Sequence, residues 1–274
     1  MHILTWNING LRAKMKDENG PFLTFMSSEI NQEKYDVMCF QEQKCNIDAL
    51  LREDANGNET LQHFGQHKYI AHTTENAKKG YAGACILSKH PFESVQVGLN
   101  NKIHDSNGRV VTVKMKDADI VVICVYVPNS GEGLKNLSYR INEWNADFLQ
   151  HISEVEDKFP NSTIVLCGDF NAAHEDSDVY DAKRFKNKAA GFHDEERNWV
   201  ASLIDNHGYV DAFKPSIDLC RSNHYTFWSN MGGMRKKNKG WRIDYFFVKN
   251  GTFKHCRNLQ FVMGSDHCPL ELRI

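Results

Sequence analysis

The run Arg109-Val-Val-Thr-Val-Lys-Met115 is followed by the polar segment Lys116-Asp117-Ala118-Asp119 and a second apolar run, Ile120-Val-Val-Ile-Cys-Val-Tyr-Val127. Both runs are rich in β-branched residues, and a short polar connection between two such runs predicts a β-hairpin. A hairpin makes neighbouring strands antiparallel, which argues against a strict alternation of parallel strands and crossover helices. The hairpin therefore favours an α/β protein with antiparallel or mixed sheets.

Other short apolar runs, bounded by Gly, Asn, Asp or Pro, predict further strands on both sides of the hairpin. Two sheets packed face to face, with helices outside, fit this number of strands, although composition leaves a single large mixed sheet open. The further predicted strands are Ile3–Trp6, Val37–Phe40, Gly83–Ser88, Ile164–Phe170, Tyr225–Trp228, Arg242–Val248 and Leu270–Ile274.

Two segments have apolar residues at the three- and four-residue spacing that predicts an amphipathic helix. The first follows Asn136, and the second begins with acids at 194–196 and ends before Gly208, as favourable helix ends do. The apolar face of the first helix consists of Ile141, Trp144, Phe148, Ile152 and Val155, and that of the second consists of Trp199, Leu203 and Ile204.

Length and composition limit the class of protein. The 274 residues are 41% hydrophobic and contain no low-complexity linker, so we expect one domain over residues 1–274. The formal net charge of −2 means that any contact with nucleic acid must use local basic residues. Eight cysteines without a CxxC pair predict buried free thiols in a reducing, intracellular compartment. The strand-like start and the lack of a run of about 20 apolar residues predict neither secretion nor a membrane partner.

Carboxylates lie at the ends of several predicted strands. Glu42 follows Val37–Phe40, and Asp169, Asp244 and Asp266 each lie beside an apolar stretch. Carboxylates gathered at one edge of a sheet repel one another unless a cation or a hydrogen-bond network offsets the repulsion. Oxygen ligands without a Cys/His cluster predict Mg²⁺ or Mn²⁺ rather than zinc. This pattern predicts metal-assisted cleavage of a phosphoester.

Each candidate residue also has a simpler interpretation. Glu42 alone would be a solvated loop acid, and His267 alone would be a surface histidine. Tyr126 ends a strand too apolar to face water, so it is either a core aromatic or a phenol near a phosphate. In the functional interpretation, His267 donates a proton or contacts phosphate, and a hydrogen bond from its imidazole to Asp244 orients it.

Fragments distributed over nearly the whole chain carry a resemblance to a known family. They include Trp6-Asn7-Ile8-Asn9-Gly10, Gln41-Glu42-Gln43-Lys44, Gly168-Asp169-Phe170-Asn171, Tyr225-Thr226-Phe227-Trp228, Gly240-Trp241-Arg242-Ile243-Asp244-Tyr245 and Gly264-Ser265-Asp266-His267. With these motifs the chain resembles exonuclease III-type apurinic/apyrimidinic endonucleases of the endonuclease/exonuclease/phosphatase superfamily. The resemblance implies a four-layer α/β sandwich, in which two mixed sheets are flanked by helices and the site lies at one edge.

The resemblance also implies roles in hydrolysis. Asp169 would position or deprotonate the attacking water, and Asn171 would hydrogen-bond the scissile phosphate. His267, paired with Asp244, would contact the phosphate, with Tyr126 against it. Glu42 and Asp266 would be the main ligands of Mg²⁺ or Mn²⁺. The full set of candidate ligands is Asn7, Asn9, Glu42, Asp169, Asn171, Asp266 and His267.

The implied substrate is double-stranded DNA containing abasic or 3′-blocked sites, cleaved 5′ to abasic sites by a monomer that also has 3′→5′ exonuclease activity. Phe227 and Trp241 would line a pocket for an extrahelical baseless sugar, and a role as core aromatics is the alternative. Another superfamily phosphoesterase, either a nonspecific nuclease or an inositol-phosphate phosphatase, stays open, as does a non-catalytic relative. The implied DNA contacts are Arg12, Lys44, Lys79, Asn129, Phe227, Trp241 and the basic loop 235–239.

Two positions depart from the family pattern. Asn9 stands where some members carry Asp, so the metal shell has one fewer anion and the affinity for Mg²⁺ is expected to be lower. Glu132 stands where some members place a basic residue that intercalates into DNA, so penetration of the duplex is not expected there.

Overall fold

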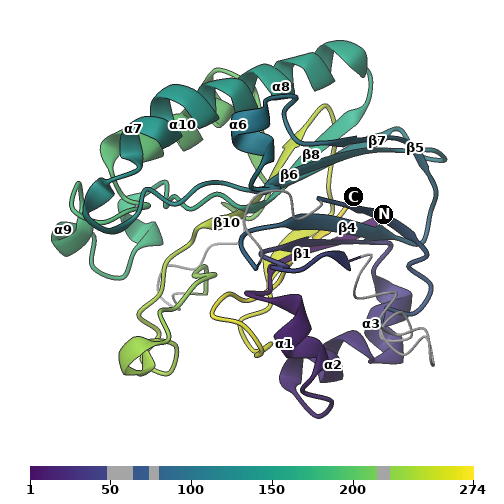
Figure 1. The fold of residues 1–274 in the computed structure, drawn as a ribbon, viewed down its shortest axis with the longest axis horizontal. Coiled ribbons are helices and arrows are strands. Elements are labelled where there is room, and N and C mark those ends of the chain that lie inside the picture. Colours follow the sequence, from purple (N-terminus) through teal and green to yellow (C-terminus); the bar gives the residue numbers. More distant parts are fainter. Residues whose placement is uncertain (48–63, 74–79, 215–222) are drawn as a thin grey trace.

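The computed structural model describes residues 1–47, 64–73, 80–214 and 223–274. Two six-stranded sheets pack face to face, and helices cover the outer face of each (Figure 1). The predicted four-layer α/β sandwich is therefore confirmed, and the alternative of a single large sheet is excluded.

The first sheet contains both ends of the chain. Strands β1 and β2 are parallel, and the other neighbours in this sheet are antiparallel. Its strand order is β11 (His255–Asn258), β12 (Leu270–Arg273), β1 (His2–Asn7), β2 (Val37–Gln41), β4 (Ala84–Ser88) and β3 (Tyr69–His72).

The second sheet contains the predicted hairpin. Val110 of β6 pairs with Val125 of β7 in an antiparallel register, which confirms the hairpin, whereas β7 and β8 are parallel. The strand order is β5 (Phe92–Val97), β6 (Val110–Met115), β7 (Ile120–Tyr126), β8 (Thr163–Asp169), β10 (Asp244–Lys249) and β9 (Val210–Asp211).

Both faces of the central strands of each sheet are buried, so successive residues of these strands belong to different cores. In β1, Ile3 lies in the core between the two sheets, whereas Leu4 and Trp6 face the helical layer of α1 (Leu11–Met15), α2 (Pro21–Met26) and α3 (Glu29–Lys34). This burial explains why the strands appear in the sequence as continuous apolar runs.

The second helical layer contains the two helices that the sequence predicts. A π-helical turn (Arg140–Trp144) joins α7 (Leu137–Tyr139) to α8 (Asn145–Lys158), and α10 (Asp194–Asp205) packs beside them (Figure 1). The smaller helices are α6 (Lys102–Asp105) and α9 (Ala182–Phe185), and the 3₁₀ turns are Glu132–Leu134, Asp176–Asp178 and Met231–Gly233.

The π-helical turn corrects the predicted apolar face of the first helix. Trp144, Phe148, Ile152 and Val155 are buried as predicted, but Ile141 is only half-buried. A π turn inserts one extra residue into the helical repeat, so the residues before it rotate relative to those after it. Arg140 is therefore fully buried there.

The second helix also differs from its prediction in part. Trp199 and Leu203 are buried as predicted, whereas Ile204 is half-buried. Glu196, one of the acids predicted for the first turn, is completely buried. Its carboxylate accepts hydrogen bonds from the backbone N–H groups of Gly191 and His193 and therefore closes the helix end.

The prediction of a strand over Tyr225–Trp228 is wrong. Only Phe227 pairs there, through isolated antiparallel bridges to Trp241 on one side and His267 on the other, so no continuous strand forms. The short or edge strands β3, β5, β9 and β11 were not predicted.

The cysteines and the exposed loops agree with the sequence where they are described. The seven described cysteines are free and buried, and Cys220 lies outside the described residues. The polar run Asp54-Ala-Asn-Gly-Asn-Glu59, which predicts an exposed loop, also lies outside them. None of the helices in the described ranges is long and apolar enough to cross a membrane.

Candidate active site

The ends of five strands meet at one edge of the two packed sheets. Because β1 and β2 are parallel, Asn7 lies opposite Gln41, which is followed by Glu42. In the other sheet, Asp169 at the end of β8 lies opposite Tyr126 of parallel β7 and Asp244 of antiparallel β10. Strand pairing therefore brings residues that are far apart in the sequence to one place.

The backbone turns sharply where the strands end. Asn9, Glu42 and Asn171 have left-handed conformations, with φ of 48°, 55° and 47°. Such conformations are unusual for residues other than glycine and are concentrated at functional sites. Gly168 has φ 136°, and a Cβ atom there would lie 2.0 Å from the carbonyl oxygen of Val125. Glycine is therefore required immediately before Asp169.

A cavity of about 330 Å³ opens at this edge. Its polar side carries the carboxylates of Asp169 and Asp266 with the imidazole of His267, and its apolar side carries aromatic rings. The complete lining is Glu42, Tyr126, Asn129, Asp169, Asn171, Ala189, Ala190, Gly191, Phe227, Trp241, Ile243, Asp266 and His267.

Asp169 is a buried carboxylate whose proton affinity is strongly altered. The Asn7 amide donates to its Oδ2 atom at 2.9 Å, and the backbone N–H of Asn171 donates to its Oδ1 atom at 2.8 Å. Burial, followed by repulsion from Asp244, raises the pKa of Asp169 to about 7, although His267 acts in the opposite direction. The carboxyl group can therefore exchange a proton near neutral pH.

His267 and Asp244 form a buried ion pair. The Nδ1 atom of His267 lies 2.8 Å from Oδ2 of Asp244, which also accepts a 2.6 Å hydrogen bond from the Thr226 hydroxyl. Burial favours the neutral imidazole, but the charge and hydrogen bond of Asp244 outweigh it and raise the pKa of His267 to about 10. The Nε2 atom lies 3.8 Å from Asp169. His267 is therefore a cation at neutral pH beside the carboxylate of Asp169.

A second group of oxygens surrounds Glu42. The Asn7 amide donates to Glu42 Oε1 at 2.9 Å, and Lys44 Nζ lies 2.7 Å from Glu42 Oε2. Burial opposes ionisation of Glu42, but these hydrogen bonds prevail and lower its pKa. The Asn9 amide donates to Asp266 Oδ1 at 3.1 Å.

The same oxygens suit a metal ion. Lys44 Nζ also donates to Asn9 Oδ1 at 2.5 Å, so an ammonium group already stands between amide and carboxylate oxygens. Hard oxygen donors that stabilise a positive charge match the ligands of Mg²⁺ or Mn²⁺. Asp169, Asp244 and His267 form a further group whose ligand atoms lie within 4.8 Å of one another. The Asn7 amide nitrogen faces the carboxylates, and its oxygen accepts from the Asn9 backbone, so Asn7 bridges the two groups as a donor.

Asn171 and Tyr126 complete the polar side of the cavity. Asn171 donates to the carbonyl oxygen of Val127 at 2.9 Å and accepts from Asn129 at 2.8 Å, which fixes the orientation of its amide. Burial and the charge of Glu42 raise the pKa of Tyr126 well above its ordinary value. The Tyr126 phenol therefore stays protonated and can donate to an anion.

Phe227 and Trp241 form the apolar side of the cavity. Their backbones exchange two hydrogen bonds of 2.9 Å. The Phe227 ring lies 4.9 Å from the imidazole of His267, and the Trp241 ring packs 5.2 Å from that of Phe185. Both rings are half-buried, so each combines core packing with an accessible face.

The residues predicted to contact DNA differ in their exposure. Arg12 and Asn129 are exposed, and Lys79 lies outside the described residues. Lys44 is engaged with Glu42 and Asn9 within the site.

In the basic loop 235–239, Arg235 points inward, whereas the sequence predicts that it contacts DNA. It donates to three backbone carbonyl oxygens, those of Gln260, Val262 and Ser265, at 2.7–2.9 Å. The exposed cations of this loop are Lys236, Lys237 and Lys239.

The sequence did not reveal the buried pair that supports Asn171. Arg140 donates to the carbonyl oxygens of Phe170 and Asn171 at 2.8 and 2.7 Å and pairs with Glu196 at 2.9 Å. Neither side chain has exposed surface. The position of Arg140 among apolar residues of the first predicted helix could have indicated that it is buried. The predicted apolar face, however, included Ile141 and left Arg140 outside.

Known proteins resemble this chain over nearly its whole length. The model of the Endonuclease/Exonuclease/phosphatase family matches residues 4–267. An exodeoxyribonuclease of Bacillus subtilis is 35% identical over 280 residues, covering 100% of this chain and 99% of that protein. A DNA-(apurinic or apyrimidinic site) endonuclease of Dictyostelium discoideum is 33% identical over 275 residues, covering 98% of this chain and 69% of that protein.

Solved structures give the same result for the fold. The AP endonuclease of Leishmania major has a TM-score of 0.81 and 27% identity, covering 100% of this chain and 87% of that chain. The stretch that matches the family model begins before Asn7 and ends at His267, so it contains every residue that lines the cavity.

Proposed function

The chain belongs to the endonuclease/exonuclease/phosphatase family, and we propose that it is a DNA-repair phosphodiesterase that hydrolyses the DNA backbone 5′ to abasic sites. Its relatives are named as an exodeoxyribonuclease and an apurinic/apyrimidinic endonuclease, and both names describe cleavage of a DNA phosphodiester. We extend the proposal to 3′→5′ exonuclease and 3′-end-cleaning activity on double-stranded DNA.

The observation that carries the proposal is the two-sided cavity. Asp169, Asn171 and His267 lie on its polar side, where a phosphate would be bound, and Phe227 and Trp241 lie on its apolar side. An extrahelical sugar without a base presents a small, largely apolar ring next to a phosphate. A cavity of about 330 Å³ with these two sides suits that substrate.

We assign the divalent ion, Mg²⁺ or Mn²⁺, to the oxygens around Glu42 and Asp266. Asn9 is close to both groups, since it donates to Asp266 and accepts from Lys44. When bound, the ion would polarise the scissile phosphate and stabilise the negative charge that develops there.

The chemistry of the protein itself centres on Asp169 and His267. An ionised Asp169 takes a proton from the attacking water while Asn7 holds its Oδ2 atom. The cationic imidazole of His267, oriented by Asp244, stabilises the negative charge of the phosphate. Asn171 and the protonated phenol of Tyr126 donate to the phosphate oxygens.

We propose that one copy of residues 1–274 forms the whole catalytic unit, because strands of both sheets contribute to the cavity. Arg12, Asn129 and the exposed lysines of the loop 235–239 would contact the DNA backbone, which allows binding despite a net charge of −2.

The proposed substrate is tested with Trp241→Ala. If Trp241 contacts the baseless sugar, the variant should cleave a duplex with one abasic analogue more slowly while removing ordinary 3′ nucleotides at a nearly normal rate. The measurement is end-labelled product mapping on both substrates, together with the melting temperature. Phe185→Ala is the matched control, because Phe185 packs on Trp241 but is not part of the cavity lining.

The competing core interpretation gives another result. Loss of a core aromatic costs about 3–5 kcal/mol and would reduce both activities together. An equal loss of both activities in Trp241→Ala, with a large drop in melting temperature, would refute the sugar pocket. A chain that instead hydrolyses inositol phosphates and leaves abasic DNA intact would refute the proposed substrate class.

A further inference from the structure

A second cluster of titratable side chains lies at the opposite end of β1 from the cavity. His2 and Asn7 are the two ends of this six-residue strand, which places them roughly 16 Å apart at about 3.3 Å per residue. Strands β11, β12 and β1 are neighbours in the first sheet. His2 and His255 both lie opposite Arg273 of β12.

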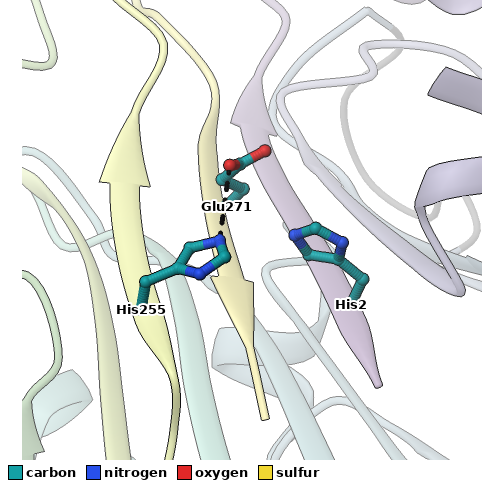
Figure 2. Close-up of side chains that lie close together, drawn as sticks. All are labelled: His2, His255 and Glu271. Carbon is teal, nitrogen blue, oxygen red and sulfur yellow. Dashed lines mark ion pairs between the residues drawn. The ribbon is translucent and has the colours of Figure 1, made fainter. Parts of the chain in front are cut away.

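The strand registers put three side chains on one face of the sheet. Residues opposite each other point to the same face, and so do residues two apart in one strand. His2, His255 and Glu271 therefore face the same side. Figure 2 shows the two imidazoles on either side of the Glu271 carboxylate. One ligand atom from each residue lies within 4.8 Å of the other two.

One ring nitrogen of each histidine in this cluster lacks a hydrogen-bond partner. The Nε2 atoms of His2 and His255 are both buried and have no hydrogen bond. The Nε2 atom of His255 lies 3.6 Å from Oε1 of Glu271. In a tetrahedral zinc site with bonds near 2.0–2.1 Å, neighbouring ligand atoms are about 3.4 Å apart. The separation of His255 Nε2 and Glu271 Oε1 is thus close to the ligand spacing of a metal site.

The carboxylate of Glu271 is held firmly on its other side. Its Oε2 atom accepts a 2.7 Å hydrogen bond from the Tyr35 hydroxyl and pairs with Lys34, so Oε1 faces the histidines. Of these two partners, the Tyr35 hydroxyl is of the kind that orients a metal ligand.

We propose that His2, His255 and Glu271 form a second metal site, selective for Zn²⁺ or a similar first-row transition ion. Two imidazoles and one carboxylate, with a water at the fourth position, are an established zinc ligand set, and imidazole nitrogens do not suit Mg²⁺. The ion would join the N-terminal strand to the two C-terminal strands. Lys34 and the neighbouring Arg273 are cations that oppose its binding.

The test measures Zn²⁺ affinity of the untagged protein by competition with a chromophoric chelator, in excess Mg²⁺ and a non-thiol reductant. One equivalent should bind. His255→Ala and His2→Ala should each weaken Zn²⁺ binding on the order of 100-fold or more. Removing a group that only hydrogen-bonds to a metal ligand already weakens binding by about 10–100-fold, and loss of a ligand should cost at least as much. His207→Ala, a half-buried histidine elsewhere, is the matched control and should bind as the wild type does.

Two further measurements make the test specific. Lys34→Gln removes a cation that competes for Glu271, so it should bind Zn²⁺ more tightly. Co²⁺ should give the strong visible absorption of a four-coordinate site in the wild type and lose it in His255→Ala. The proposal is overturned if the wild type binds no Zn²⁺ in excess Mg²⁺. It is also overturned if His255→Ala binds as tightly as His207→Ala, or if His267→Asn in the cavity abolishes binding while both cluster variants retain it.

Discussion

Two buried groups of charged side chains lie on either side of the segment 169–171, and they differ in their balance of charge. On the supporting side, Arg140 and Glu196 form one pair without exposed surface, and Arg140 also donates to two backbone oxygens of the segment. On the cavity side lie four carboxylates, those of Glu42, Asp169, Asp244 and Asp266, and the described cations within ion-pair distance of them are Lys44 and His267.

The difference separates structural charges from reactive ones. A buried pair that is matched and hydrogen-bonded holds one geometry, and removing one partner leaves an uncompensated charge. Four carboxylates with two paired cations leave an excess of negative charge, which favours binding of a cation. Burial, together with the repulsion from Asp244, raises the pKa of Asp169. The supporting group therefore holds the segment in position, whereas the cavity group has the excess charge that the proposed proton transfer and metal binding require.

The largest expected effect is on turnover in the cavity group. Asp169→Asn and His267→Asn should each lower kcat by roughly 10²–10⁴-fold, because each removes an acid–base or electrostatic group. DNA affinity should change little. Single-turnover cleavage and equilibrium DNA binding are the measurements, and Asp117→Asn in the exposed hairpin turn is the matched control. Near-normal turnover in either variant would show that its assigned role is wrong.

A comparably large effect, on stability instead of chemistry, is expected on the supporting side. Arg140→Met should lower the free energy of unfolding by about 3–5 kcal/mol, because Glu196 is left as an unpaired buried charge. Asp169→Asn should not lower it, since that change removes repulsion. Denaturant unfolding of both variants tests this contrast. Adding Glu196→Gln to Arg140→Met should recover part of the loss; equal stability of Arg140→Met and wild type would contradict the supporting role.

A smaller effect concerns the pH profile. In the proposed mechanism the cationic form of His267 is the active one. Asp244 raises the pKa of His267 to about 10, so wild-type activity should fall only at strongly alkaline pH. Asp244→Asn removes the interaction that raises this pKa, whereas burial, which lowers it, remains. The alkaline limb of kcat should therefore move to lower pH by about one unit or more, equivalent to about 1.4 kcal/mol. An alkaline limb that does not move would show that Asp244 does not set the pKa of His267.

The smallest effect is expected for Glu42→Gln. Chelation should abolish wild-type cleavage, and Mg²⁺ or Mn²⁺ should restore it. In Glu42→Gln the half-saturating Mg²⁺ concentration should rise roughly tenfold, because one anionic ligand is lost. Stability should change by no more than about 0.5 kcal/mol. Mg²⁺ titrations of activity and melting curves test this prediction. An unchanged Mg²⁺ requirement would show that Glu42 is not a metal ligand.

The fold could be predicted where the sequence carries a strong local pattern. The hairpin of β6 and β7 is visible because two β-branched runs are joined by four polar residues. By contrast, β5 has Val95 and Val97 exposed and the polar neighbours of Val95 half-buried. The usual alternation of buried apolar and exposed polar residues is therefore missing, and the strand was not predicted. Helices α1–α3 have only five or six residues each, which is too short for a periodic signal.

The site could be predicted as a set of residues but not as an arrangement. Motifs and strand ends identified Glu42, Asp169, Asp244 and His267. They did not indicate that Lys44 contacts Glu42, because a loop lysine next to a loop acid is equally able to face solvent. Arg235 was expected at the surface, yet its guanidinium is bonded to three carbonyl oxygens of another loop.

The sequence by itself determined the family, the alternation of strands and helices and the residues available for hydrolysis. These properties depend on side-chain type and short-range spacing, which the sequence records directly. Only the tertiary structure decided which charges are matched and which are in excess. Charge balance, pKa shifts and the burial of Arg140 depend on distances between residues that are distant in the sequence and on a one-residue π insertion that no local pattern reveals.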